Sequence, residues 1–421
     1  MSNENKYLII LGLLGLCFLS FNKLTDGKMC LANEPSDSKS FGDALAVDGD
    51  YLAVGDPEAN RVVLYQRTDR GRWLRTQEIV PPKGSTADRA GAGFGYALDL
   101  NQTTLVIGAY DRRRRLPDKL VDYSGAIYTA EIRSDGTIPI QEIPIPKADL
   151  IVGYTLSLFG DKVAFTGVTE ISPDLWIQRI LIADLLSGQI IRVIGPPKRP
   201  EEKSIWPTIE SPDEVGFDGF VLNVSGHQDT LLIGVESTPP KEVIYLTTAK
   251  GDLQRVEFET LGLSPNLYAG SSVVLTDDVM AIGRSGTYGP VDTLLLRRSA
   301  AGWSFLGAAD LSGPLDASGS YVLISHGQKR GMMIASTSPD PEHLLVRIDK
   351  DEMVVESEIR WQWGYQLPIR TNGVISSGNL ILSGKGRVVQ LPIASVSKSS
   401  LRRIIQLPMA SLRKHYHIRD C

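Results

Sequence analysis

Cysteine and histidine are scarce in this chain, which has three cysteines and five histidines among 421 residues. Metal and redox sites draw on these residue types, so few candidates for either exist. The net charge is −5, with charges of both signs interspersed. Without a basic excess, nucleic acid is not expected as the main partner.

The sequence signatures of common catalytic sites are also absent. There is no Gly-x-Ser-x-Gly, His-Glu-x-x-His or P-loop pattern. No loop offers acidic residues at three alternate positions, as an oxygen-ligand cage for calcium requires. His415 and His417 resemble a metal site only loosely. We therefore expect neither a metal nor another cofactor.

Long apolar runs are missing apart from one, at residues 7–21. This run is shorter than the ~20 residues that a membrane-spanning helix needs, and it suits the apolar part of a secretory signal. A small-x-small cleavage site does not directly follow it, so an uncleaved N-terminal anchor stays open. Residues 1–32 are interpreted as a signal peptide or membrane anchor with a short linker. The expected location is secreted, periplasmic or on the cell surface.

A repeated phrase is the most informative feature that is present. Residues 41–57 and 94–110 each contain Phe-Gly, a short apolar strand, a turn, a second apolar strand and another glycine. Weaker copies follow, and the seven anchor glycines are Gly42, Gly95, Gly153, Gly219, Gly270, Gly319 and Gly364. A unit of this kind cannot bury its apolar faces alone and must stack against its neighbours.

The length of the repeat, near 50 residues, predicts an all-β, seven-bladed β-propeller of four-stranded antiparallel blades. In the first unit we expect strands at 44–47, 51–54, 61–67 and 73–80, and the last strand of the seventh at 401–407. The anchor glycines stand on the strand that lines the crowded axis of the ring, where a residue without a Cβ allows close backbone approach and positive φ. A glycine also ends the second strand in six of the units. The propeller is assigned to residues 33–411 and a C-terminal tail to 412–421.

The first two copies resemble the FG-GAP repeat of the integrin α-subunit head. The elements that carry the resemblance are Phe41-Gly42 with Gly55-Asp56-Pro57, and Phe94-Gly95 with Gly108-Ala109-Tyr110. The resemblance implies a seven-bladed propeller that serves as a binding platform. Calcium, which many members of that family bind, is not carried over because the acidic loops are missing here.

The cysteines suggest a clasp between the ends of the ring. Cys30 and Cys421 flank the repeats, and the first and last blades of a propeller are neighbours. In an oxidising compartment a Cys30–Cys421 disulfide could contribute ~4–5 kcal/mol. Two unpaired cysteines are the alternative. Mass spectrometry under non-reducing conditions decides between them, because a free thiol at Cys421 excludes the clasp.

One face of the predicted ring carries the longer loops, those that join strand d to strand a and strand b to strand c. In blade two such a loop contains Arg112, Arg113, Arg114 and Arg115, which could bind carboxylate, sulfate or phosphate. Between blades three and four another contains Lys198, Arg199 and Trp206. The alternatives are a solvated charge run and a tryptophan packed against a blade.

Taken together, these patterns favour an exported, non-enzymatic binding module for an extracytoplasmic protein or polysaccharide. Its alternative is a secreted propeller glycosidase or lyase, which would place paired carboxylates or clustered histidines in a central pocket. His227, His326 and His343 fall in separate blades at unmatched positions. Trp73 and Trp303 begin the fourth strand of their blades and are expected to pack between blades.

Overall fold

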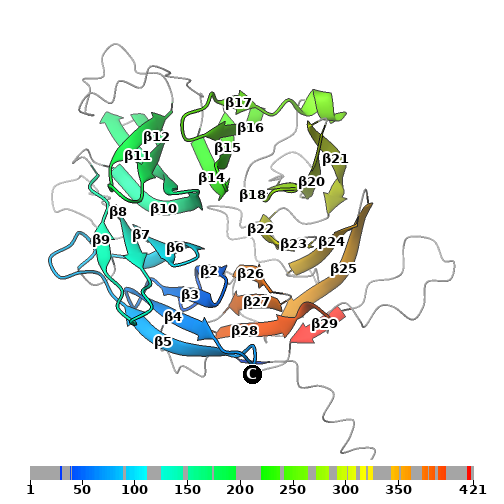
Figure 1. Ribbon diagram of the computed structural model, residues 1–421. Coiled ribbons are helices and arrows are strands. Elements are labelled where there is room, and N and C mark those ends of the chain that lie inside the picture. The colour runs from blue at the N-terminus through cyan, green and yellow to red at the C-terminus, as the bar shows by residue number, and fades with distance from the viewer. Residues whose placement is uncertain are drawn as a thin grey trace, which may run out of the picture.

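The chain folds as a ring of seven β-sheets around a common axis (Figure 1). The computed structural model describes residues 29–30, 38, 40–88, 92–110, 125–145, 150–172, 175–195, 220–237, 241–263, 272–283, 292–300, 302–309, 313–318, 321–325, 343–349, 352–361, 372–377, 379–384, 387–394 and 415–418. The predicted all-β class and the seven antiparallel blades are confirmed. In this described part, no helix has the length and apolar character needed to cross a membrane.

The blades follow one another along the chain. Blade one contains β2 (Leu45–Asp48), β3 (Tyr51–Asp56), β4 (Arg61–Arg67) and β5 (Trp73–Ile79). Blade two contains β6 (Phe94–Asn101), β7 (Thr104–Tyr110), β8 (Gly125–Glu131) and β9 (Ile140–Glu142). Blade three contains β10 (Leu150–Phe159), β11 (Lys162–Ser172), β12 (Leu175–Asp184) and β13 (Ile190–Ile194). Blade four contains β14 (Phe220–His227), β15 (Thr230–Ser237), β16 (Lys241–Thr248) and β17 (Gln254–Arg255). The 3₁₀ helix η2 (Phe258–Leu261) follows, and blade five contains β18 (Val273–Leu275), β19 (Val279–Gly283), β20 (Thr293–Ser299) and β21 (Gly302–Ala309).

The last two blades each take a strand from a chain end. Blade six contains β22 (Gly313–Ser318), β23 (Tyr321–Ser325), β24 (His343–Asp349) and β25 (Glu352–Trp361), and β29 (His415–Ile418) adds to β25 in parallel. Blade seven contains β26 (Asn372–Ser376), β27 (Asn379–Gly384), β28 (Arg387–Pro392) and β1 (Met29–Cys30).

The apolar core lies between the blades rather than inside one. Each blade is a single sheet with two faces, so its apolar side chains must be covered by the neighbouring sheets. The described buried side chains form seven clusters, and each cluster joins residues of two adjacent blades, including blades seven and one. In blade two the central residues of β7 are buried throughout, whereas the outer strand β5 of blade one is buried only at its end residues, Trp73 and Ile79.

Pairs of glycines set the contact between neighbouring blades near the axis. A Cβ on Gly55, near the end of β3, would lie 2.1 Å from the carbonyl oxygen of Gly95, the anchor of blade two. In the next junction, a Cβ on Gly108 would lie 2.5 Å from the Gly153 carbonyl oxygen. The anchors also need glycine for their backbone, because φ is 89° at Gly42, 90° at Gly95 and 84° at Gly153. Both glycine positions of the repeat therefore serve one inter-blade contact.

The N-terminal strand closes the ring. Met29 pairs with Gln390 and Cys30 with Val389, so β1 lies along the free edge of β28. The hydroxyl of Ser383 donates to the carbonyl of Gly42 at 2.6 Å, which joins blade seven to blade one near the axis. The sequence prediction placed residues 401–407 at this outer edge. Those residues lie outside the described part, and β1 occupies the edge instead.

Candidate functional site

A cavity of about 300 Å³ lies between blades four and five. Hairpins that join strand a to b and strand c to d form its walls, so it opens on the face opposite the longer loops. Its main lining residues are His227, Gln228, Thr230, Thr248, Gly251, Asp252, Gln254, Thr276, Asp277, Arg298 and Trp303. This volume lies at the lower end of the range for small-molecule sites.

The wall from blade four is held in place by blade three. Arg192, a buried residue of β13, donates from one guanidinium nitrogen to the carbonyls of Thr248 at 2.8 Å and Gly251 at 2.7 Å. The same nitrogen donates to the hydroxyl of Thr247 at 3.1 Å. A charged group bonded to three acceptors fixes the hairpin between β16 and β17 without a ligand. This side of the cavity is therefore preformed.

The opposite wall meets blade four through Asp277. The Oδ1 atom of Asp277 accepts a hydrogen bond from the side-chain amide Nε2 of Gln228 at 2.6 Å and lies 3.2 Å from Nε2 of His227. Asp277 belongs to the hairpin between β18 and β19, whereas His227 and Gln228 end β14 and begin the next turn. The three side chains thus bridge two blades beside the cavity.

Trp303 lines the cavity from the first residues of β21. The guanidinium carbon of Arg298, its partner across the strands, lies 5.9 Å from the ring centre. Blade one repeats this cross-strand pair as Arg67 and Trp73. There the tryptophan is 5% exposed and belongs to the core between blades seven and one. Trp303 also packs against the core of its junction but is only partly buried, so the two equivalent positions differ.

Four side chains near the axis tie the inner strand of one blade to the next. Each accepts a hydrogen bond from a backbone N–H at the equivalent place of the following blade: Asp99 from Leu158 (2.7 Å), Ser157 from Gly226 (2.8 Å), Ser225 from Leu275 (3.0 Å) and Asp316 from Ile375 (2.6 Å). We call these four residues the inner-strand acceptors.

The two acids among the inner-strand acceptors each bind a second amide. Asp99 accepts from Leu100 and Asp316 from Ala317, both at 2.8 Å. In the preceding blades, Ala46 takes the place of Asp99 and Val274 takes the place of Asp316. Neither side chain can accept a hydrogen bond, so the N–H groups of Leu100 and Ala317 receive no acceptor from those two positions. An acid therefore stands where one side chain must satisfy two N–H groups. Burial raises the pKa of Asp99, and burial with a smaller effect from the Asp99 charge raises the pKa of Asp316 to about 7.

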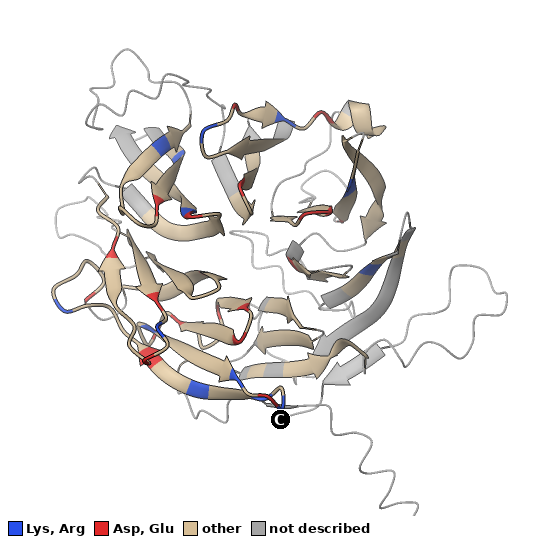
Figure 2. Cartoon of the chain, viewed as in Figure 1, with Lys and Arg blue, Asp and Glu red and all other residues tan. Residues whose placement is uncertain are grey.

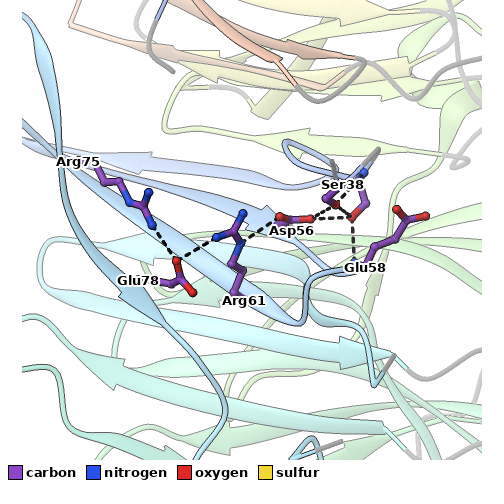
Figure 3. A network of polar contacts seen from close by, with 7 residues as sticks. Ser38, Asp56, Glu58, Arg61, Arg75 and Glu78 are labelled. Carbon is purple, nitrogen blue, oxygen red and sulfur yellow. Dashed lines mark hydrogen bonds and ion pairs between the residues drawn. The ribbon is translucent and has the colours of Figure 1, made fainter. Parts of the chain in front are cut away.

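A polar network at the start of blade one has a structural explanation (Figure 3). Asp56 is fully buried and accepts from the hydroxyls of Ser38 and Ser40 and from Nε of Arg61 at 3.1 Å. Arg61 also donates to Glu78 at 2.9 Å. A buried carboxylate needs such partners, and here they tie the segment after β1 to blade one. Nothing in this network points to a ligand.

Three tyrosines meet on the opposite face, near the axis between blades two and three. Tyr110 lies with its ring centre 5.1 Å from those of Tyr96 and Tyr154, which are themselves 5.5 Å apart. All three are partly buried. Tyr96 and Tyr154 directly follow the anchor glycines of their blades. Tyr110 stands two positions before the arginine-rich segment, Arg112–Arg115. Each ring of this aromatic cluster packs on the other two.

The candidate binding residues from the sequence all fall outside the described part of the chain. These are Arg112, Arg113, Arg114, Arg115, Lys198, Arg199 and Trp206, and Cys421 of the suggested disulfide falls there too. Lys and Arg, and likewise Asp and Glu, are spread over several strands and turns of the described blades (Figure 2). Among the described residues, no three His, Cys, Asp or Glu side chains are arranged to hold a metal ion.

Sequence reasoning missed the cavity, although it noted two of its residues. His227 was not made a candidate because it and two other histidines fall in separate blades at unmatched positions. Trp303 was assigned to packing between blades, which is part of its role. The walls come from hairpins about 50 residues apart, so no local pattern joins them. The tyrosine cluster had a detectable signal, namely a tyrosine after the anchor glycine in both blades two and three.

Comparisons with known proteins do not name a family. Neither a protein-family model nor a curated protein sequence matches the chain. Similar solved structures include one described as the mitotic checkpoint complex (10% identity, TM-score 0.48, 86% of this chain and 92% of that chain), hydrazine synthase of Kuenenia stuttgartiensis (12%, 0.48, 86% and 97%) and a protein of Lactobacillus plantarum (11%, 0.42, 75% and 83%). The protein is a seven-bladed β-propeller.

Proposed function

We propose that this propeller is an exported, non-enzymatic binding module with FG-GAP-like blades, and that its partner is an extracytoplasmic polysaccharide or protein. The preformed cavity between blades four and five is the observation that carries the proposal. Arg192 fixes one of its walls, and the lining offers a tryptophan together with hydrogen-bonding groups. Such a lining suits a sugar better than a flat protein surface, so the cavity favours the polysaccharide.

The FG-GAP resemblance gains support from the way its residues are used. Phe41 and Phe94 are 1% and 0% exposed, and the glycines that follow them share a positive φ. Glycines of the second element, Gly55 and Gly108, make the inter-blade contacts. In this proposal the glycine spacing maintains the scaffold, and the partner is recognised by side chains outside it.

Two described acids near the axis, Asp99 and Asp316, support binding rather than hydrolysis as the function. A propeller glycosidase needs two carboxyl groups that can reach the scissile bond. Both oxygens of Asp99 and of Asp316 accept hydrogen bonds from backbone amides. These acids therefore hold the inner strands together. Because their oxygens are already hydrogen-bonded, we interpret their role as structural.

Export is proposed from residues 7–21. The pairing of β1 adds a condition, because cleavage after residue 32 would remove Met29 and Cys30 from blade seven. We therefore expect any cleavage to occur before Met29. Intact mass of the mature chain checks this expectation, and a mature N-terminus beyond Cys30 would contradict it.

To test the binding role, the purified full chain is incubated with soluble polysaccharides and, separately, with the secreted proteins of the producing organism. We expect a polysaccharide or a specific protein to be retained, with the chain length of the polysaccharide unchanged in size-exclusion chromatography. A variant with Arg112–Arg115 changed to serine tests the arginine-rich segment in the same assay. Release of shorter fragments would instead support the enzyme alternative, and no retention of either class would refute the binding module.

A further inference from the structure

We propose that the cavity between blades four and five binds a single neutral sugar unit of a polysaccharide. This inference rests on the proposed binding function and narrows it to one site and one class of ligand. The site uses five side chains: His227, Asp252, Asp277, Arg298 and Trp303. Two blades contribute to it, so it exists only in the assembled ring.

The size of the cavity selects a small ligand. Its volume of about 300 Å³ is enclosed on two sides by hairpins of neighbouring blades. A folded partner would need a broad, accessible face to bury enough surface. A sugar unit at the end or side of a polysaccharide chain can enter such a space, while the rest of the chain continues over the hairpins.

The lining chemistry matches a hydroxylated, uncharged ligand. Every sugar hydroxyl donates one hydrogen bond and accepts others, so its site needs both kinds of group. Asp252 and Asp277 supply acceptors, Arg298 supplies donors, and the neighbouring threonine and glutamine side chains supply both. Two carboxylates against one arginine disfavour a sulfated, phosphorylated or uronic acid unit, because those anions would be repelled.

Trp303 gives the site an apolar surface beside these polar groups. Sugar rings have C–H faces that pack on aromatic rings, and tryptophan buries more area than other side chains. In blade one the tryptophan of the same cross-strand Arg–Trp pair, Trp73, is only 5% exposed. In blade five the tryptophan stays partly accessible and borders a cavity. The repeat therefore provides its own internal comparison.

The site also needs a rigid frame, which the neighbouring residues supply. Arg192 holds the hairpin that carries Asp252, and Gln228 fixes the Asp277 carboxylate from across the junction. Side chains fixed before binding lose little entropy when the ligand arrives. Neither Arg192 nor Gln228 must touch the sugar for this positioning role.

Affinity electrophoresis of the full chain tests the inference. The gels contain dextran, mannan or galactan as neutral probes, or polygalacturonate as an anionic probe. We expect at least one neutral polysaccharide to retard the wild type, and millimolar glucose, mannose or galactose to reverse that retardation. Trp303→Ala should weaken binding at least about tenfold, and Asp252→Ala and Asp277→Ala about fivefold to tenfold each.

Matched controls come from blade one. Asp69→Ala and Asp50→Ala change exposed acids in the equivalent hairpins, and both should bind within about twofold of the wild type. Because Asp252 and Asp277 are exposed, their variants should also melt within about 2 °C of the wild type. Loss of binding with unchanged melting would thus come from the site itself.

The outcomes separate this inference from the broader function. If a neutral polysaccharide binds and the three cavity variants bind it equally well, the cavity assignment is wrong and the binding module stands. Preference for polygalacturonate overturns the neutral-sugar assignment. If no polysaccharide binds but a secreted protein is retained, the sugar site is wrong and the protein alternative holds.

Discussion

Replacing Gly55 by alanine should lower the free energy of unfolding by roughly 3–5 kcal/mol. The new Cβ would lie 2.1 Å from the Gly95 carbonyl oxygen and 3.3 Å from the Ala44 Cβ. The first of these neighbours is backbone and cannot rotate away, so blades one and two must separate near the axis. Chemical denaturation followed by tryptophan fluorescence measures the loss.

Gly307→Ala is the matched control for this prediction. Gly307 is also a strand glycine without positive φ, but the nearest atom to its Cβ would be Cε of Met353 at 3.6 Å. Ordinary contact of this kind should change the unfolding free energy by no more than about 1 kcal/mol. Equal losses in the two variants would show that strand glycines in general, rather than the inter-blade contact, limit stability.

Replacing Asp316 by asparagine should remove an unusual dependence of stability on pH. The pKa of Asp316 rises from 3.8 to about 7 on folding, so the folded state favours its protonated form. The contribution of Asp316 to stability is therefore fully present below pH 3.8, falls as the pH rises to about 7 and is constant above that. Such a pKa change corresponds to at most about 4 kcal/mol, and the partial exposure of Asp316 reduces this figure.

The measurement compares the unfolding free energies of the wild type and Asp316→Asn between pH 4.5 and 8.5. We expect the wild type to lose stability relative to the variant as the pH rises. Asparagine can still accept from Ile375 but leaves the Ala317 amide without its acceptor, which adds a constant loss of about 1 kcal/mol.

Asp135→Asn provides a control of opposite sign. Hydrogen bonds from Thr137 lower the pKa of Asp135, so its contribution is present above pH 3.8 and is lost as the pH falls further. Across pH 4.5 to 8.5 this variant should differ from the wild type by a constant amount. A constant difference for Asp316→Asn as well would mean that Asp316 titrates as an ordinary solvated acid.

The sequence predicted the scaffold well because the repeat is a local signal. Residues 61–67 were expected as a strand and form β4 with the same bounds. The anchor glycines were assigned to close backbone approach, and Gly95 and Gly153 make it. Short-range features of this kind depend on residues that stand near one another in the chain.

The features that sequence reasoning missed join residues that are far apart. β1 is a two-residue strand whose partner lies some 360 residues later, and Met-Cys carries no strand pattern of its own. Asp99 and Asp316 look like ordinary polar positions until the next blade offers its amides. The cavity likewise depends on how two hairpins of different blades face each other.

All of these inter-blade features require a closed ring, so the pairing of β1 with β28 is the most direct point to test. Residues opposite each other in antiparallel strands have Cα atoms about 4.5–5.5 Å apart, within reach of a disulfide. Cys30 is opposite Val389. In a Cys17→Ser, Cys421→Ser background, Val389→Cys should therefore form a disulfide with Cys30 under mild oxidation.

Mass spectrometry of the digested protein identifies the linked peptides. Val388→Cys in the same background is the control, because successive side chains of a strand point to opposite faces. We predict that Cys30 is linked to the cysteine introduced at position 389 in most of the folded protein, and that the variant at position 388 forms no such link. Absence of the link at position 389, or equal links at both positions, would contradict a ring closed by its N-terminal strand.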